Sequence, residues 1–134
     1  MRLLVLAPDA VDAAAVRRAL PDDDLTGAEV LVIAPAIQES GLRFWMSDSD
    51  GAIKDAERAA SETAGSLRAK TDARNVRATT GESEPLLALQ DALAMFPADR
   101  ILVFQRDGDD ERYREEDLAE AQERFGVPLS TARL

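Results

Sequence analysis

Two short segments carry side chains that could bind a ligand. Asp9 follows the apolar run from Leu3 to Ala7, and its carboxylate could accept hydrogen bonds from a ribose or a base edge. The second segment reads Gln105-Arg106-Asp107-Gly108-Asp109-Asp110. There, Arg106 could pair with an anion, and Gly108 permits a tight turn or a close approach of the backbone. The aspartates repel a phosphate unless a cation lies between them, so a nucleotide bridged by Mg²⁺ is one interpretation.

Both segments also have a structural interpretation, which we favour. Asp9 stands where aspartate commonly caps a helix, here one expected from about Ala10 to Leu20. Asp109 and Asp110 likewise fit the start of a helix from about Glu111 to Phe125, where negative charge stabilises the positive end of the helix dipole. The sequence therefore offers a capping role and a binding role for the same carboxylates.

A long connection from Pro35 to about Gly51 contains Phe44 and Trp45. One interpretation is a flap whose rings stack on a ligand or a partner. The alternative, which we favour, is that the two rings fold back over the sheet edge while Asp48 or Ser49 caps the next helix. Connections of this length carry function more often than short ones do.

Another candidate is the turn from Thr79 to Ser83, which contains Gly81. The glycine allows a sharp turn, and the free N–H groups at the start of the following helix can hold an anion. Glu82 and Glu84 already place negative charge there, so a turn with Ser83 as the helix cap is the favoured interpretation.

The elements that must position these loops alternate between strands and helices. Short apolar or alternating runs predict five strands, at Leu3–Ala7, Glu29–Ala34, Asn75–Thr79, Arg100–Phe104 and Leu129–Leu134. Helical spacing predicts four helices, with inward faces that include Val11, Val16, Ile53, Ala56, Ala60, Leu67, Leu86, Leu89, Phe96, Leu118 and Phe125. This alternation predicts a doubly wound α/β domain over residues 1–134, with a mainly parallel sheet and helices on both faces.

Composition excludes several classes of function. The chain of 134 residues has no cysteine and no histidine, which excludes thiol nucleophiles, Cys/His zinc sites and histidine-based triads. Its 16 basic and 26 acidic residues give a net charge of −10, which argues against a nucleic-acid partner. No nucleophile is paired with a base, so we expect no enzymatic activity. A phosphoacceptor receiver domain is also excluded, because Thr79-Thr80 ends the third strand where an aspartate is needed.

Nothing in the sequence indicates a membrane. The apolar run Met1–Ala7 ends at Pro8, well short of a signal-peptide core with its cleavage site. No apolar stretch approaches the roughly 20 residues that a membrane span requires. We therefore expect a cytoplasmic protein.

The turn Thr80-Gly81-Glu82-Ser83-Glu84-Pro85 and the stretch from Leu89 to Leu134 resemble the universal stress protein family. The resemblance is to small single-domain actinobacterial members, and it extends to Leu42–Asp48, Asp91–Ile101 and Glu120–Leu129. It implies a five-stranded parallel sheet of order 3-2-1-4-5. It also implies a homodimer through the last strand, which at a sheet edge would expose backbone groups that a second copy could pair with.

Some members of that family bind ATP through an Asp after the first strand, which Asp9 matches, and through a loop of pattern G-x-x-G, nine residues, then G-S or G-T. Here Gly108 is the only glycine between Gln105 and Phe125, so the backbone cradle for phosphates is largely missing. We therefore expect a non-catalytic stress-response or regulatory domain that acts through dimerisation or partner binding, without ATP. The alternative is a nucleotide-binding module (ATP or AMP) with a variant, Mg²⁺-assisted loop, whose ligand contacts are Asp9, Gly81, Arg106, Asp107 and Gly108.

Overall fold

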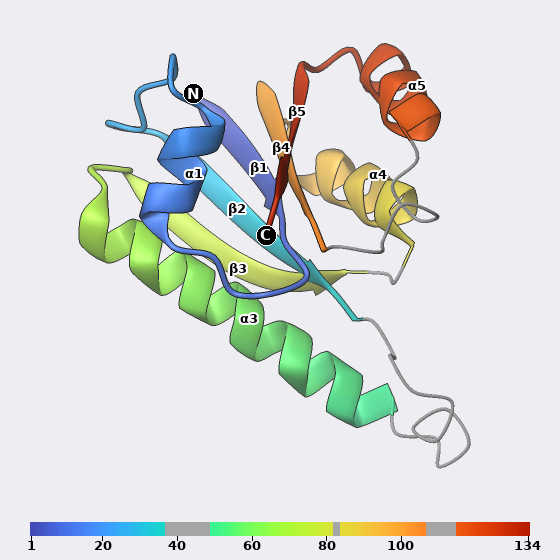
Figure 1. The fold of residues 1–134 in the computed structure, drawn as a ribbon, viewed down its shortest axis with the longest axis horizontal. Coiled ribbons are helices and arrows are strands. Elements are labelled where there is room, and N and C mark those ends of the chain that lie inside the picture. The colour runs from blue at the N-terminus through green and yellow to red at the C-terminus, as the bar shows by residue number, and fades with distance from the viewer. Residues whose placement is uncertain (37–48, 82–83, 107–114) are drawn as a thin grey trace.

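The computed structural model describes residues 1–36, 49–81, 84–106 and 115–134. Five strands are present in these residues: β1 (Arg2–Leu6), β2 (Glu29–Pro35), β3 (Asn75–Gly81), β4 (Arg100–Gln105) and β5 (Leu129–Arg133). The helices described are α1 (Ala13–Ala19), α3 (Ser49–Lys70), α4 (Pro85–Met95) and α5 (Glu115–Phe125). The strands form one parallel sheet of order β3-β2-β1-β4-β5, which confirms the expected topology (Figure 1).

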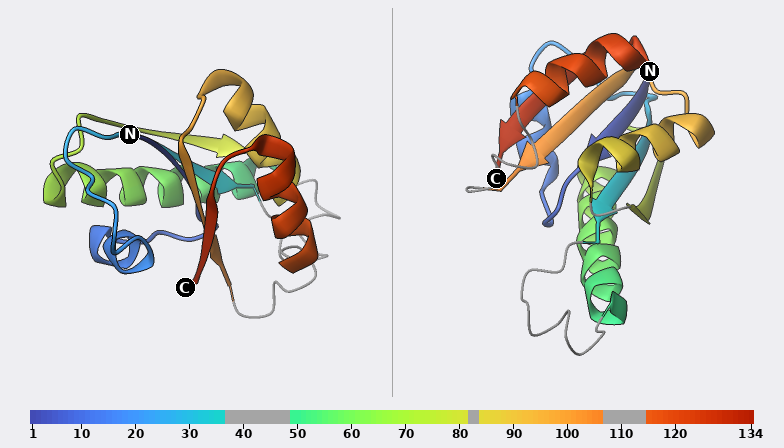
Figure 2. Two further views of the ribbon diagram at one scale, coloured as in Figure 1. Left: turned by 90° about the horizontal axis from the view of Figure 1, so that it is seen from above. Right: turned by 90° about the vertical axis from the view of Figure 1, so that its right-hand side faces the viewer.

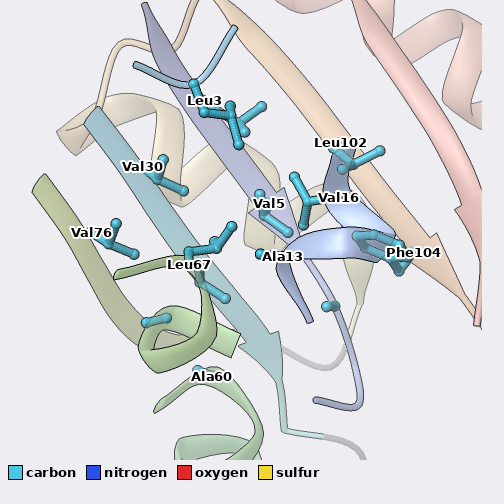
Figure 3. Close-up of a cluster of buried hydrophobic side chains, with 14 of the residues drawn as sticks. Leu3, Val5, Ala13, Val16, Val30, Ala60, Leu67, Val76, Leu102 and Phe104 are labelled. Carbon is cyan, nitrogen blue, oxygen red and sulfur yellow. The ribbon is translucent and has the colours of Figure 1, made fainter. Parts of the chain in front are cut away.

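The sheet separates two apolar layers. Alternate residues of a strand point to opposite faces, so Leu3 and Val5 of β1 face one layer and Leu4 and Leu6 face the other. All four are fully buried, as expected for a central strand of a parallel sheet covered on both faces. Figure 3 shows the first layer, in which side chains of the sheet meet Ala13, Val16, Ala60 and Leu67 from two helices.

Helices cover both faces of the sheet. Helices α1 and α3 pack on one face and α4 and α5 on the other, as the two perpendicular views in Figure 2 show. The connections after β1 and β2 therefore lie on one side, and those after β3 and β4 lie on the other. This is the doubly wound arrangement that the alternation of elements predicts.

Two predicted details of these elements are wrong. Ile53 is predicted on the inward face of α3, but it is 40% exposed. With 22 residues, α3 is roughly 33 Å long, whereas a seven-residue strand spans about 23 Å. The first turns of α3 therefore extend beyond the core, and Ile53 instead lines a hollow beside Thr80 and Gly81 of β3. The third strand also continues past Thr79 to Gly81.

The described helices include none that is long and apolar enough to cross a lipid bilayer. Strands β3 and β5 form the two edges of the sheet, and each pairs with one described neighbour, β2 and β4 respectively. The chain thus carries two sheet edges as well as the loops at the carboxyl ends of the strands.

Candidate functional site

Loops at the carboxyl ends of β1 and β4 meet at the centre of the sheet. The chain leaves β1 toward β2 on one side, whereas β4 lies on the other side of β1, so the direction of winding reverses between β1 and β4. Ligands of open parallel sheets bind at this reversal, beyond the carboxyl ends of the strands. The fold therefore makes the crevice between the β1 and β4 loops the first candidate site.

The side chains at this crevice pair with each other. The Arg106 guanidinium donates from Nε to Asp9 Oδ2 at 2.6 Å and from Nη2 to Asp9 Oδ1 at 2.5 Å. Such a two-pronged contact matches the planar fork of arginine to both oxygens of a carboxylate. The Asp9 side chain is 50% exposed and that of Arg106 is 27% exposed. The structure thus brings together two of the predicted binding residues and joins them by an ion pair that we call the Asp9–Arg106 bridge.

Asp9 does not cap the first helix, contrary to the favoured prediction. The N-cap of α1 is Asp12, whose Oδ1 accepts the N–H of Ala15 at 2.8 Å. Ahead of this cap, side chains of α3 bind the backbone of the connection: Thr63 Oγ1 accepts the Val11 N–H at 3.0 Å.

The Ala13 N–H is likewise accepted by Ser66 Oγ at 3.0 Å. These tertiary contacts satisfy N–H groups that a longer helix would otherwise have to cap, so α1 begins three residues later than expected. The Asp9 carboxylate is thereby left to pair across the crevice.

The Asp9–Arg106 bridge limits what the crevice can bind. Each oxygen of Asp9 already accepts one guanidinium bond, and the positive charge of Arg106 neutralises the carboxylate. A ribose, a base edge or an anion at this crevice would therefore compete with the Asp9–Arg106 bridge for these groups. The charged groups that a nucleotide would need at this crevice are therefore paired with each other.

Gly81 lies at the end of β3, and its role is packing. A Cβ atom at this position would lie 2.8 Å from Ile33 Cγ2 and 3.1 Å from Ala88 Cβ. Only a glycine lets α4 approach β2 and β3 this closely. The cap of α4 is Glu84, whose carboxylate accepts the N–H groups of Leu86 and Leu87, so the predicted Ser83 cap is wrong. Glu84 thereby occupies N–H groups that an anion would need.

A second hollow lies beside the β3 edge, at a place that the sequence pattern does not predict. It is a groove of about 440 Å³ between β3 and α4, which we call the β3–α4 groove. Leu31 and Ile33 of β2 form its apolar floor, and Asp91 and Met95 of α4 stand on its wall. The sequence gives one indication of this groove, because the apolar residue Met95 falls outside the predicted apolar face of its helix. In the structure the Met95 side chain is 78% exposed.

The remaining predicted site residues lie outside the described parts of the chain. These are Phe44 and Trp45 of the long connection, and Asp107 and Gly108 after β4. The helix caps expected at Asp48, Asp109 and Asp110 also fall outside them. Within residues 1–36, 49–81, 84–106 and 115–134, no group of three or more acidic side chains is arranged to hold a metal ion.

Comparison with known proteins bears on the fold. Neither a protein-family model nor a curated protein matches the sequence. Among solved structures, the crystal structure of a hypothetical protein, PH0823, is similar, with a TM-score of 0.62 and 14% sequence identity over 98% of this chain and 95% of that one. At this identity the likeness shows the fold alone. The chain is therefore a doubly wound α/β protein with a parallel sheet of order 3-2-1-4-5.

Proposed function

We propose that this chain is a non-catalytic regulatory domain of the universal stress protein type, which acts through dimerisation or partner binding and does not bind ATP. Three features support the proposal: the sheet order that the resemblance implies, the missing loop glycines, and the Asp9–Arg106 bridge. The bridge carries the proposal, because it occupies the aspartate that ATP-binding relatives would use.

Calorimetric titration with ATP, with and without Mg²⁺, tests the nucleotide part of the proposal. The protein must first be checked for co-purified nucleotide. We expect no saturable heat and no bound nucleotide. Saturable binding in the micromolar range would contradict the proposal and support the Mg²⁺-assisted alternative. In that case Asp9→Asn and Arg106→Ala should each abolish the binding, whereas Arg18→Ala, an exposed arginine of α1, should leave it unchanged.

The outer edge of β5 supports the dimer. The Ile101 N–H donates to the Pro128 carbonyl and the Leu134 N–H to the Gln105 carbonyl, both at 2.9 Å. Successive residues of a strand turn their backbone groups to opposite edges, so those of Thr131 face away from β4. Among the described residues no hydrogen bond occupies the outward backbone groups of Thr131, so a second copy could add to the sheet there.

A proline at Thr131 tests the dimer without disturbing the ladder to β4. We expect the wild-type chain to run at twice its monomer mass of 14.5 kDa in light scattering after gel filtration. Thr131→Pro removes an outward N–H and should give a folded monomer, because proline cannot donate to a strand across the edge. Thr131→Ala is the matched control and should remain dimeric. A monomeric wild type, or a Thr131→Pro variant that stays dimeric, would contradict dimerisation through β5.

A further inference from the structure

The β3–α4 groove lies next to an edge strand, a combination that suits an extended chain. Strand β3 is the outermost strand on its side of the sheet (Figure 1). Its residues Thr79 and Thr80 border the groove, whose opposite wall is the α4 surface around Ala92 and Met95. The floor is apolar, and Thr79 pairs with the floor residue Ile33 in the register of β2 and β3, so its side chain lies on the groove side of the sheet. A strand added beyond β3 would therefore point every second side chain toward the groove.

The backbone groups on the outer edge of β3 come from alternate residues. The Gly81 carbonyl accepts the Ala36 N–H at 3.1 Å, so the backbone of Gly81 faces β2. Since successive residues turn their backbone groups to opposite edges, those of Val76, Ala78 and Thr80 face away from the sheet. These three residues present the donors and acceptors that an added strand would pair with.

The first of these three outward-facing residues is already capped by the protein. The Arg68 side chain of α3 donates to the Val76 carbonyl from Nε at 3.0 Å and from Nη2 at 2.5 Å. A charged side chain at this point prevents the start of β3 from pairing with another strand. Within the described residues no comparable cap lies on Ala78, and the Thr80 carbonyl accepts the hydroxyl of Thr79 at a long 3.4 Å. In the described parts of the chain, the stretch of this edge without such a cap, Ala78 to Thr80, is therefore the stretch that borders the groove.

Charge indicates the character of the occupant. Asp91 is exposed on the groove wall, and no basic side chain of the described residues forms an ion pair with it. The chain as a whole carries a net charge of −10, which attracts basic segments and repels acidic ones. A lysine or arginine beside an apolar residue would match both the carboxylate and the apolar floor.

We propose that the β3–α4 groove binds an extended peptide of a partner protein, which adds to the Ala78–Thr80 edge as a further strand. The peptide places an apolar side chain on the groove floor and a lysine or arginine next to Asp91. This proposal rests on the proposed partner binding and names its surface and the chemistry of its partner. The backbone pairing supplies affinity, and the groove with its carboxylate supplies specificity.

Selection of peptides followed by a binding measurement tests the proposal. Phage-displayed random peptides are panned against the immobilised full chain, and a labelled synthetic peptide of the enriched sequence is titrated by fluorescence anisotropy. We expect enriched peptides to combine apolar or β-branched residues with lysine or arginine. Asp91→Lys should weaken binding by at least about tenfold, because it places like charges together. N-methylation of alternate peptide amides should weaken binding similarly, because it removes the N–H groups that pair with the edge.

Glu120→Lys is the matched control, since Glu120 is an exposed acidic residue of α5 and the charge change is the same. It should leave the affinity within about twofold, which confirms that net charge alone does not explain the loss. Circular dichroism melts establish that both variants are folded. The proposal is overturned if no peptide is enriched, if Asp91→Lys binds as well as the wild type, or if N-methylation has no effect.

These outcomes are distinguishable from a failure of the proposed function. Absence of a peptide in a chain that is dimeric and binds no ATP would overturn the β3–α4 groove as a docking site and leave the regulatory dimer in place. Micromolar ATP binding would overturn the proposed function whatever the peptides do.

Discussion

The carboxyl end of the sheet differs between its centre and its β3 edge. At the centre, where parallel sheets of this kind bind ligands, Asp9 and Arg106 bridge the two loops. At the β3 edge, the groove along α4 is open and has Asp91 on its wall. The topology of the sheet thus determines where a ligand can bind, whereas the side chains at that place determine which groups are available to it.

The two regions also differ in how they are held together. In the described residues, the central crevice is spanned by the ion pair of Asp9 and Arg106, whose side chains are partly exposed, and such pairs contribute only about 0.2–1 kcal/mol. The β3–α4 groove is held open by the packing of α4, with Leu89 fully buried and Ala88 against the position of Gly81. The groove should therefore be the more rigid region, and mutations that test it should have larger effects.

Truncation of Leu89 should have the largest effect of the variants considered. Leu89 is fully buried under α4, so Leu89→Ala should lower the free energy of unfolding by about 2–5 kcal/mol. Leu87 of the same helix is 48% exposed, and Leu87→Ala should change it by less than about 0.5 kcal/mol. Urea denaturation followed by circular dichroism measures both. Equal effects would show that α4 does not pack on the sheet as described, and the groove wall would be lost with it.

A methyl group at Gly81 should have the next largest effect. Gly81→Ala places a Cβ atom 2.8 Å from Ile33 Cγ2 and should destabilise the fold by about 1–3 kcal/mol through overpacking. At Gly65, in the interior of α3, a Cβ atom would meet no neighbouring atom within 4 Å, so Gly65→Ala should stabilise by about 0.5–1 kcal/mol through helix propensity. Thermal unfolding of the two variants shows whether each substitution raises or lowers the stability. A Gly81→Ala variant as stable as the wild type would contradict the close approach of α4.

Variants of the two aspartates before α1 should distinguish the helix cap at Asp12 from the ion pair at Asp9 by their loss of stability. Asp12→Ala should cost about 1 kcal/mol, and Asp12→Ser should restore most of it, because serine also caps helices. Asp9→Asn should cost less, about 0.2–1 kcal/mol, and its effect should shrink at high salt. Urea denaturation at low and at high salt measures the stability loss of each variant and its salt dependence. A larger, salt-independent loss at Asp9 would indicate that Asp9 is the cap after all.

The smallest expected effect comes from the titration of Asp24, at the end of the sheet opposite to the Asp9–Arg106 bridge. The backbone N–H and then the hydroxyl of Thr26 bind the Asp24 carboxylate and lower its pKa below the ordinary value for aspartate. The contribution of Asp24 to stability is therefore complete above the unfolded pKa of about 3.9, and is lost as the pH falls through the lower folded pKa. Carbon-detected NMR should show this depressed pKa, and Thr26→Ala should raise it only in part because the backbone bond remains. An ordinary pKa in the wild-type chain would contradict the turn.

Much of the fold could be predicted from the sequence. The runs at Leu3–Ala7 and Arg100–Phe104 are apolar enough to identify central strands, and the spacing of Ala56, Ala60 and Leu67 identifies the buried face of α3. The cap of α1 could not be predicted, because both Asp9 and Asp12 precede the alanine-rich segment. The choice between them depends on Thr63 and Ser66, which lie far along the chain and bind the backbone just before the helix and at its first residue.

The candidate site could be predicted less completely. The alternation of elements places the loops of Asp9 and Arg106 at the same end of the sheet, but their pairing depends on side-chain geometry across 97 positions of sequence. The β3–α4 groove depends on how closely α4 packs against β2 and β3, which periodicity does not show. Asp91 gives no signal in the sequence, because an exposed acidic residue on a helix is ordinary.

An NMR titration of the wild-type chain with ATP and Mg²⁺ tests the central claim most directly, because it reports where a nucleotide binds as well as whether it does. The account predicts that the amide signals of Asp9, Arg106 and their neighbours show no saturable shift up to millimolar nucleotide. Saturable shifts of those signals at micromolar nucleotide would show that the Asp9–Arg106 bridge opens for a ligand, and would contradict the account.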